Sequence, residues 1–482
     1  MKYLSFLGTR LGVLAIVLFI ALVNPSMLAY AAFAFSGATT TALSPGSAND
    51  INEALKILFN DPVANDVVSD SELLQYFEED NNVKTDETTG GRYIETAQYF
   101  QLPAGVGFRA ENEYFPVPEG PVIKNSRVTL KKAQGAVEMT GDVMRRVKGD
   151  MGAFLNWAER ALPDLVTRLN NEIDRSLIGF GAGIKARVQA APAGAVIPVD
   201  RSWGVTGSLD PFLAFLEGER IVFSANANGN PLRSAGATQS AKVVDVNPDT
   251  ATPDIFQNIT VDAVPAGVAI GDYIFAGDPA GSSSQDGTGA DREFMGLLGM
   301  VDDGTILATF QNLLRASYRL WKSIVKDGSV APHNGVLTEG LLTLADDETY
   351  TKGGGKPNLI ITSRSGLRSY WNSLKSDRVL NDPRAYTGGK GPVQVILGDR
   401  TVTLKAVRKM PPNFTFGLQT DTFKRWTLGG WEWDDTPGSV WQRVTDATGR
   451  KDAYYAVGNL YKQLGNLFPR KNWRIEKLLR SL

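Results

Sequence analysis

The side chains that most often perform catalysis or bind metals are scarce in this sequence. Its 482 residues include no cysteine and a single histidine, His333. Disulfides, thiolate metal sites and cysteine nucleophiles are therefore excluded, and one histidine cannot supply a multi-histidine site. His333 lies in a loop-like stretch between Pro332 and Asn334, and no Gly-x-Ser-x-Gly motif partners it for a triad. We interpret it as a polar loop residue, and expect no catalytic residue, no metal site and no cofactor.

Two glycine–lysine stretches invite comparison with phosphate-binding loops. The pattern Gly-x-x-x-x-Gly-Lys-Ser/Thr is not met at Gly353-Gly-Gly-Lys356. Pro357 follows that lysine, and the glycines precede a predicted strand instead of a helix. Gly388-Gly-Lys-Gly391 is likewise followed by Pro392. We interpret both stretches as flexible loops.

Aromatic and basic side chains near the end of the chain could bind sugars, bases or phosphates. A strand-like stretch at Phe414–Phe416 is followed by four tryptophans: Trp426, Trp431, Trp433 and Trp441. Such a cluster can stack on ligands, but we favour core or subunit-interface packing. Basic residues at the terminus form a candidate surface for DNA or for a partner's acidic segment. They are Arg470, Lys471, Arg474, Lys477 and Arg480.

The composition is that of a folded globular protein, with 43% hydrophobic and 21% charged residues. The length suffices for two or three domains that each bury a core. The formal net charge of −2 gives no overall basic signature for nucleic acid.

A polar two-stranded arm that leads into a long helix dominates residues 90–183. Gly91–Phe100 is β-rich, glycines and prolines punctuate the chain as far as Pro121, and Ser126–Met139 brings it back as a second strand. Apolar residues then recur at gaps of three and four, which predicts a helix of roughly 25 residues. This stripe comprises Phe154, Trp157, Ala158, Ala161, Leu162, Leu165, Leu169, Ile173 and Leu177.

Proline and glycine set the limits of this helix. Pro163 lies inside the pattern and should kink the helix or break it in two. Gly179, Gly181 and Gly183 should end it.

An arm too polar to form a core suggests an element that reaches other subunits. The alternative is a surface hairpin on an ordinary α+β enzyme. Deletion of Gly105–Asn125 should therefore leave a folded subunit while abolishing any closed assembly.

The order of these elements resembles the major capsid proteins of tailed bacteriophages, which have the Hong Kong 97 type of fold. The resemblance rests on Gly91-Arg92 opening the arm, Val137-Glu-Met-Thr-Gly141 closing it, and the helix running into Ile178-Gly-Phe-Gly-Ala-Gly183. It covers roughly residues 50–475 in element order. It implies an α+β fold with an extended β-arm, a long spine helix and an inserted small β-domain.

The resemblance, with the composition shifts, divides the chain into seven segments. Residues 1–35 are a hydrophobic signal-like segment, 36–89 a linker and N-arm, 90–140 the extended β-arm, 141–197 the spine helix and peripheral domain, 198–302 an inserted β-rich domain, 303–410 the axial domain, and 411–482 a β-rich return to the peripheral domain. The resemblance also implies that the acidic N-arm, Ile51–Asn82, lies along a neighbouring subunit.

Local patterns place the remaining elements. Three short strands are predicted in the insertion, at Ala241–Val246, Asn258–Ala263 and Asp272–Phe275. Gln311–Ile324 has a helical pattern, Thr338 is a suitable N-cap, and Asn358–Ser363 has the composition of a buried strand followed by a helix. Asp452–Tyr461 resembles the closing strand beneath the spine helix. The insertion could also be a carbohydrate- or partner-binding module.

The first 35 residues fit a secretory signal better than a membrane span. Lys2 and Arg10 precede the apolar run Leu11–Val23, and an Ala-x-Ala site follows at Ala29–Ala31. This conflicts with assembly in a host cytoplasm, unless Met27 is the true start or a protease removes the segment. We expect residues 1–26 to be absent from the mature particle, because no nearby apolar face could cover the run. An intact mass that begins at Met1 would contradict this.

Together these observations favour a major capsid protein of a tailed phage or prophage, which self-assembles into an icosahedral head that encloses DNA. The resemblance implies pentamers and hexamers of the chain itself, with scaffold, portal and maturation protease as partners and packaged DNA contacted non-specifically. Such a protein is located in the virion, is not an enzyme and has no small-molecule substrate. The alternatives are an exported β-rich surface or binding protein, supported by residues 1–35, and a hydrolase with dispersed carboxylates.

Overall fold

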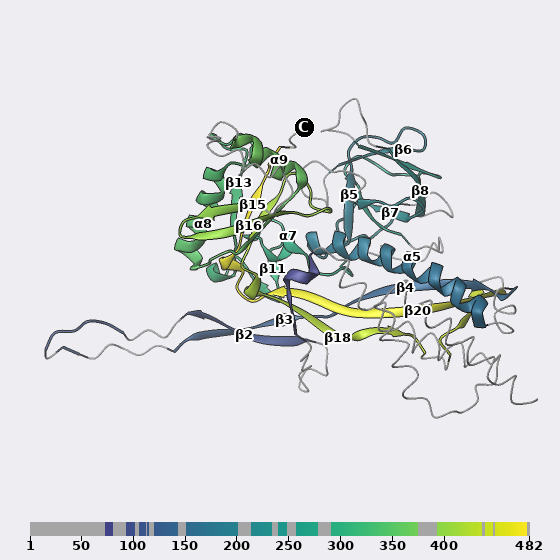
Figure 1. Ribbon diagram of the computed structural model, residues 1–482, viewed down its shortest axis with the longest axis horizontal. Helices are drawn as coiled ribbons and strands as arrows, with labels where there is room; N and C mark the ends of the chain where they lie inside the picture. The colour runs from purple at the N-terminus through teal and green to yellow at the C-terminus, as the bar shows by residue number, and fades with distance from the viewer. Residues whose placement is uncertain are drawn as a thin grey trace, which may run out of the picture.

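The computed structural model describes residues 73–80, 93–101, 106–111, 113–114, 120–142, 151–200, 214–233, 240–247, 257–277, 291–374, 393–435, 439–446 and 449–479. These residues form an α+β protein, so the predicted class is confirmed. A two-stranded arm, a five-stranded sheet under a long helix, a closed barrel and a six-stranded sheet make up the molecule (Figure 1). None of the described helices is both long and apolar enough to cross a membrane.

The five-stranded sheet is built around one strand of 18 residues, β20. Strands β18 and β19 pair antiparallel with β20, β4 pairs with it as well, and the three-residue β1 runs parallel to β18. The bounds are β1 Glu78–Asp80, β4 Lys131–Thr140, β18 Phe423–Trp433, β19 Gln442–Asp446 and β20 Gly449–Asn466. The predicted closing strand at Asp452–Tyr461 lies within β20.

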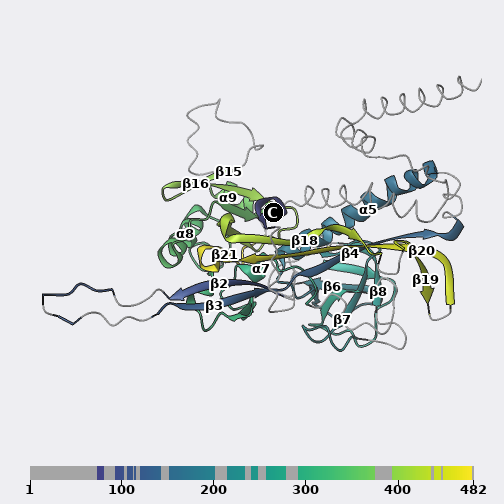
Figure 2. The same ribbon diagram turned by 90° about the horizontal axis from the view of Figure 1, so that it is seen from below.

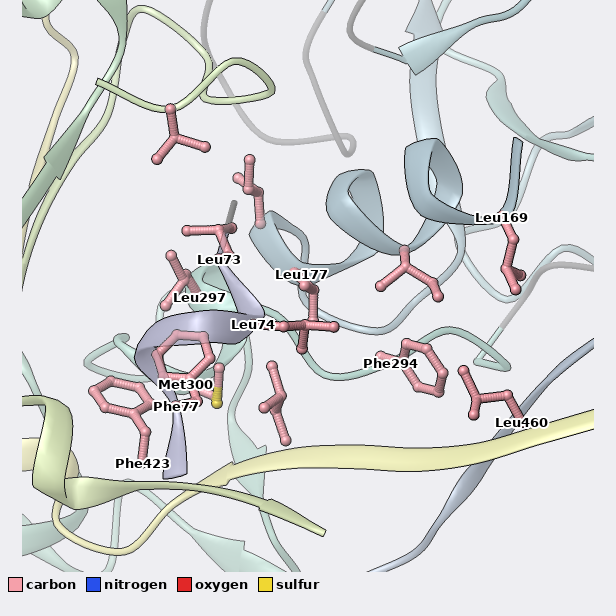
Figure 3. Close-up of a cluster of buried hydrophobic side chains, with 14 of the residues drawn as sticks. Leu73, Leu74, Phe77, Leu169, Leu177, Phe294, Leu297, Met300, Phe423 and Leu460 are labelled. Carbon is pink, nitrogen blue, oxygen red and sulfur yellow. The ribbon is translucent and has the colours of Figure 1, made fainter. Parts of the chain in front are cut away.

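Helix α5, Met151–Ile178, lies across this sheet and supplies one wall of the main core. Leu169, Ile173 and Leu177 of the predicted stripe are buried in the main core, which also contains Leu460 of β20. Figure 3 shows Leu169 and Leu460 on the same side of this core. The helix continues through Pro163, so of the two expected effects, a kink or a break in two, the break does not occur. Tertiary packing of its C-terminal half outweighs the loss of one backbone hydrogen bond.

The arm is a hairpin of β2, Ile94–Gln101, and β3, Val122–Val128. It projects beyond the body of the molecule in both views (Figures 1 and 2). The expected single return strand, Ser126–Met139, is in fact two strands. β3 pairs with β2 in the arm, whereas β4 starts at Lys131 and pairs along its length with β20. The chain therefore changes sheets between Val128 and Lys131.

Six strands close the barrel, in the order β10-β5-β6-β9-β8-β7. Their bounds are β5 Ile184–Val188, β6 Val196–Asp200, β7 Arg220–Ser224, β8 Ser240–Asn247, β9 Gln257–Val261 and β10 Tyr273–Ala276. The three strands predicted for the insertion correspond to β8, β9 and β10. The expected domain limits at residues 198 and 302 need correction, because the barrel begins at Ile184 and the later segment around Leu297 packs in the main core.

The six-stranded sheet has the order β13-β21-β17-β14-β16-β15 and carries two helices. Its elements are β13 Ile324–Asp327, α8 Glu339–Gly353, β14 Leu359–Thr362, α9 Arg364–Ser373, β15 Val393–Leu397, β16 Arg400–Ala406, β17 Thr415–Leu418 and β21 Trp473–Glu476. Hydroxyls of Thr338 and Ser363 accept hydrogen bonds from the first turns of α8 and α9, which confirms the predicted N-cap and the strand–helix unit. The expected boundary at residue 410 is too early, since β17 and β21 complete this sheet.

The helix predicted over Gln311–Ile324 is absent. Strands β11, Thr309–Phe310, and β12, Leu313–Leu314, form a tight hairpin there, followed by the short 3-10 helix η4, Arg319–Trp321. Gln311 and Asn312 occupy its two-residue turn with φ angles of 49° and 65°. Left-handed conformation at both turn positions matches the twist of a hairpin and ends any helix. The preceding short helix α7, Leu297–Met300, lies in the core.

Candidate assembly surfaces

The base of the arm is fixed to the body by apolar contacts. Ile94 and Val128 pack with Trp426 of β18, and the Phe100 ring lies 4.5 Å from that of Tyr318 between ring centroids. The backbone N–H of Arg127 also donates a hydrogen bond of 2.9 Å to the Gln311 carbonyl in the β11–β12 turn. The arm therefore leaves the body in a defined direction.

The outer part of the arm carries apolar side chains that touch none of the described core. Val106, Phe108 and Tyr114 are 94–108% exposed, and Tyr99 and Ile123 form an exposed cross-strand pair nearer the base. Fully exposed aromatic side chains on a projecting hairpin gain nothing within their own chain. They are the surface that a second subunit would be expected to cover.

The described part of the N-arm, Leu73–Asp80, packs on its own chain, contrary to the expectation that it lies along a neighbour. Leu73, Leu74 and Phe77 are buried in the main core, where Figure 3 shows Phe77 beside Phe423. The acidic strand β1 then pairs with β18. The rest of the N-arm, the linker and the signal-like segment lie outside the described residues.

Two ion pairs and one hydrogen bond also connect this N-terminal segment to the two sheets. Glu78 pairs with Lys424, Glu79 pairs with Arg425, and the Tyr76 hydroxyl accepts a hydrogen bond from Lys405 of β16. The segment therefore contacts both the five-stranded and the six-stranded sheet. Burial opposes ionisation of Glu79, but Arg425, Thr427 and Lys462 together outweigh it and lower the pKa of that carboxyl.

Lys462 of β20 lies under the same segment and should make stability depend on pH. Burial first, and then the charge of Arg425, lowers its pKa to about 8, although Glu79 acts in the opposite direction. Between about pH 8 and 10.5 the unfolded chain binds the extra proton, so the free energy of unfolding should rise with pH in this window. We expect Lys462→Met to lose that rise, as measured by thermal unfolding at pH 8 and pH 10. An equal rise in the variant would contradict the assignment.

A buried network of five charged groups joins α5 to the barrel. Lys185 is fully buried and bonds Glu219 and, at 3.0 Å, Glu172 of α5. Arg175 bonds the same Glu172, also at 3.0 Å, and Glu293. Burial disfavours the Glu172 carboxylate, but Lys185 and Arg175 lower its pKa to about 2. This network fixes the barrel to the helix.

A second buried network changes the interpretation of the basic C-terminus. Asp302 accepts hydrogen bonds from Arg315 at 2.9 Å and from Arg474 at 3.2 Å, and all three side chains are fully buried. Lys477 pairs with Asp327 at 2.6 Å. Arg474 is therefore part of the core and cannot contact DNA, and Arg480 lies outside the described residues. The predicted basic surface therefore loses Arg474, whereas Arg470 and Lys471 are partly exposed and Lys477 is exposed.

Comparison with known proteins returns structural similarity only. No family model and no curated relative matches the chain. The capsid asymmetric unit of cyanophage A-1(L) is 11% identical, with a TM-score of 0.43 and coverage of 80% of this chain and 88% of that one. The capsid of an empty GTA particle is 7% identical, with a TM-score of 0.41 and coverage of 85% and 90%. The capsid of Myoviridae phage XM1 is 8% identical, with a TM-score of 0.38 and coverage of 84% and 91%.

The residues that first suggested chemistry have structural contacts. Nδ1 of His333 lies 2.8 Å from the Thr338 hydroxyl, the N-cap of α8, so the histidine is a loop residue as predicted. Gly354 ends α8 in the left-handed conformation, at a φ of 62°. A Cβ on Gly353 would lie 2.2 Å from the Arg470 carbonyl oxygen. Gly353 thus allows close packing against the chain near Arg470, and Gly388–Gly391 lies outside the described residues.

The tryptophan cluster is a core feature. Trp426, Trp431, Trp433 and Trp441 are all buried, with Trp431 and Trp433 in edge-to-face contact at 5.5 Å between ring centroids. A Cβ on Gly458 of β20 would lie 1.9 Å from the Trp431 ring. The favoured interpretation, packing instead of ligand stacking, is confirmed. Within the described residues, no three acidic or histidine side chains converge to hold a metal.

Proposed function

We propose that this chain is the major capsid protein of a tailed phage or prophage, a subunit that assembles with copies of itself into an icosahedral shell around DNA. The observation that carries the proposal is the arm. Its base is anchored by Ile94, Val128 and Phe100, while its outer part presents Phe108 and Tyr114 to solvent. A lattice subunit needs such an arm, fixed at its base and exposed at its tip, to contact its neighbour.

The geometry also sets the kind of contact. The arm and the body that would receive it are different surfaces of one chain, and we assign them a heterologous contact, in which the arm of each copy binds the body of the next. A heterologous contact repeats from copy to copy and forms rings when its rotation closes. Each contact can be weak, because release of one subunit from a closed lattice requires several to break together. Pentameric and hexameric rings are the closed forms that we assign to it.

The remaining partners follow from this role. Scaffold, portal and maturation protease act on the subunit during assembly in the host cytoplasm, and the mature protein resides in the virion. Contact with packaged DNA is non-specific and is made through phosphates. Arg474 takes no part in it, since that side chain is buried. The chain itself performs no catalysis.

Sedimentation velocity and light scattering of the purified protein test the proposal. We expect a species of many subunits, either rings or shells, when scaffold and protease are co-expressed. Exposed aromatic side chains on a fixed arm favour association at micromolar subunit concentration. A stable monomer under all these conditions would overturn the proposed function.

A further inference from the structure

The turn that follows β7 of the barrel contains an Asn-Gly step, Asn228-Gly229. Asn228 is exposed, and its Oδ1 accepts a hydrogen bond of 3.2 Å from the Asn230 N–H. This is an Asx turn, in which the asparagine side chain folds back along its own backbone and lies against the next peptide unit. The Asn228 carboxamide is therefore held next to the Gly229 backbone nitrogen.

The surroundings of this turn leave the carboxamide accessible. Asn226 and Asn230 are exposed as well, and no described residue hydrogen-bonds Nδ2 of Asn228. The Gly229 N–H donates a bond of 3.1 Å to the Asn226 carbonyl, but a single bond in an exposed turn opens readily. Solvent can therefore reach both the nitrogen that would attack and the amide group that would leave.

These groups are the ones needed for closure of a succinimide ring. The Gly229 nitrogen attacks Cγ of Asn228, the Cγ–Nδ2 bond breaks, and ammonia leaves with the proton from the Gly229 nitrogen. Water then opens the ring at one of its two carbonyls and leaves an aspartate or an isoaspartate at position 228. The Asn230 N–H stabilises the oxygen on which negative charge develops, and glycine has no side chain to block the attack.

A second Asn-Gly step, Asn334-Gly335, has the same sequence but a fixed backbone. The Gly335 N–H donates a bond of 2.8 Å to the Gly328 carbonyl, and the Gly335 carbonyl accepts one of 2.8 Å from the Leu479 N–H. Gly335 is also buried, and a Cβ there would lie 2.5 Å from the Leu479 side chain. Ring closure at Asn334 therefore requires this part of the fold to open first.

We infer that Asn228 is a site of spontaneous deamidation in the folded protein, whereas the fold protects Asn334. Each event adds one negative charge to the barrel, and the isoaspartate form also lengthens the backbone of the turn. In an assembly of many copies these charges add up, so particles would become more acidic with age. The reaction needs only water and the turn itself, so the inference holds for the isolated chain and does not rest on the proposed function.

Peptide mapping by mass spectrometry, after incubation of the full chain at mildly alkaline pH, tests the inference. The chain unfolded in guanidinium chloride is the reference, because both Asn-Gly steps are then equally free and should react at similar rates. In the folded protein we expect Asn228 to convert at least about tenfold faster than Asn334, since only Asn334 must wait for local opening. Similar rates at the two sites in the folded protein, or no conversion at Asn228, would overturn the inference.

Isoelectric focusing of the incubated protein provides a second readout. The wild-type chain should acquire a more acidic species with time. Asn228→Gln should lose this species, because the longer glutamine side chain does not place its carbonyl carbon for succinimide closure. Asn226→Gln, which changes an exposed residue of the same turn that precedes alanine, is the matched control and should keep it. An acidic species that forms equally fast in Asn228→Gln would refute the assignment to Asn228.

Discussion

A chain without the arm tip, residues 106–120, should fold normally and form no closed shells. The described tip side chains contribute nothing to any buried cluster, and the β2–β3 pairs from Ile94↔Val128 to Gln101↔Val122 would remain. The longer deletion, Gly105–Asn125, would also remove part of β3 and is the less selective experiment. Circular dichroism and thermal unfolding report the fold, and electron microscopy reports the shells.

The loss of shells should be large because every subunit would lose the same arm contact. Burying one aromatic side chain gains about 2 kcal/mol, and each subunit of a shell would lose that gain at its arm. Phe108→Ser combined with Tyr114→Ser should therefore reproduce the deletion. Ile270→Ser, which alters an exposed apolar side chain on the barrel, is the matched control and should assemble normally. Global unfolding of the deletion variant would show that the tip belongs to the core.

Asp302→Ala should destabilise the isolated subunit by about 3–5 kcal/mol. The substitution leaves Arg315 and Arg474 buried without their shared carboxylate. It also removes the acceptor for the backbone N–H groups of Gly304, Ile306 and Leu307. Burial already lowers the pKa of Arg315 to about 10, and at neutral pH the guanidinium stays charged.

Denaturant unfolding of the subunit measures this loss. The control is Asp327→Ala, which breaks a surface pair with Lys477 at 2.6 Å whose side chains are 33% and 48% exposed. An exposed pair contributes at most about 1 kcal/mol, so the control should unfold near the wild-type midpoint. Similar midpoints for the two variants would contradict the role assigned to the buried network.

Elements with strong local signals could be predicted from the sequence. The apolar stripe of α5, the Thr338 cap of α8 and the buried strand β14 each combine periodicity with a start or stop residue. The hairpin at Gln311–Asn312 could not, because side chains of a hairpin and a following 3-10 turn can face one core with helix-like spacing. The left-handed turn at Gln311–Asn312 is what rules out a helix there, and it contains no glycine that would predict it.

Most of the contacts that could not be predicted from the sequence join residues that are far apart in the chain. Glu172 and Arg175 are three residues apart on a helix and could have been paired, but Lys185 meets Glu219 only because the barrel closes. The sequence predicts Arg474 as a surface charge near the C-terminus, but β21 places it beside Asp302 in the core. A cavity between α5, the start of β4 and residues 292–294 likewise combines segments that no local pattern connects.

Cryo-electron microscopy of the particles made by the full chain, co-expressed with its scaffold and protease, tests the central claim most directly. We expect closed icosahedral shells in which the density for residues 106–114 of each subunit lies against the body of a neighbour. Particles whose arms contact no other subunit, or a sample that contains only isolated subunits, would contradict it.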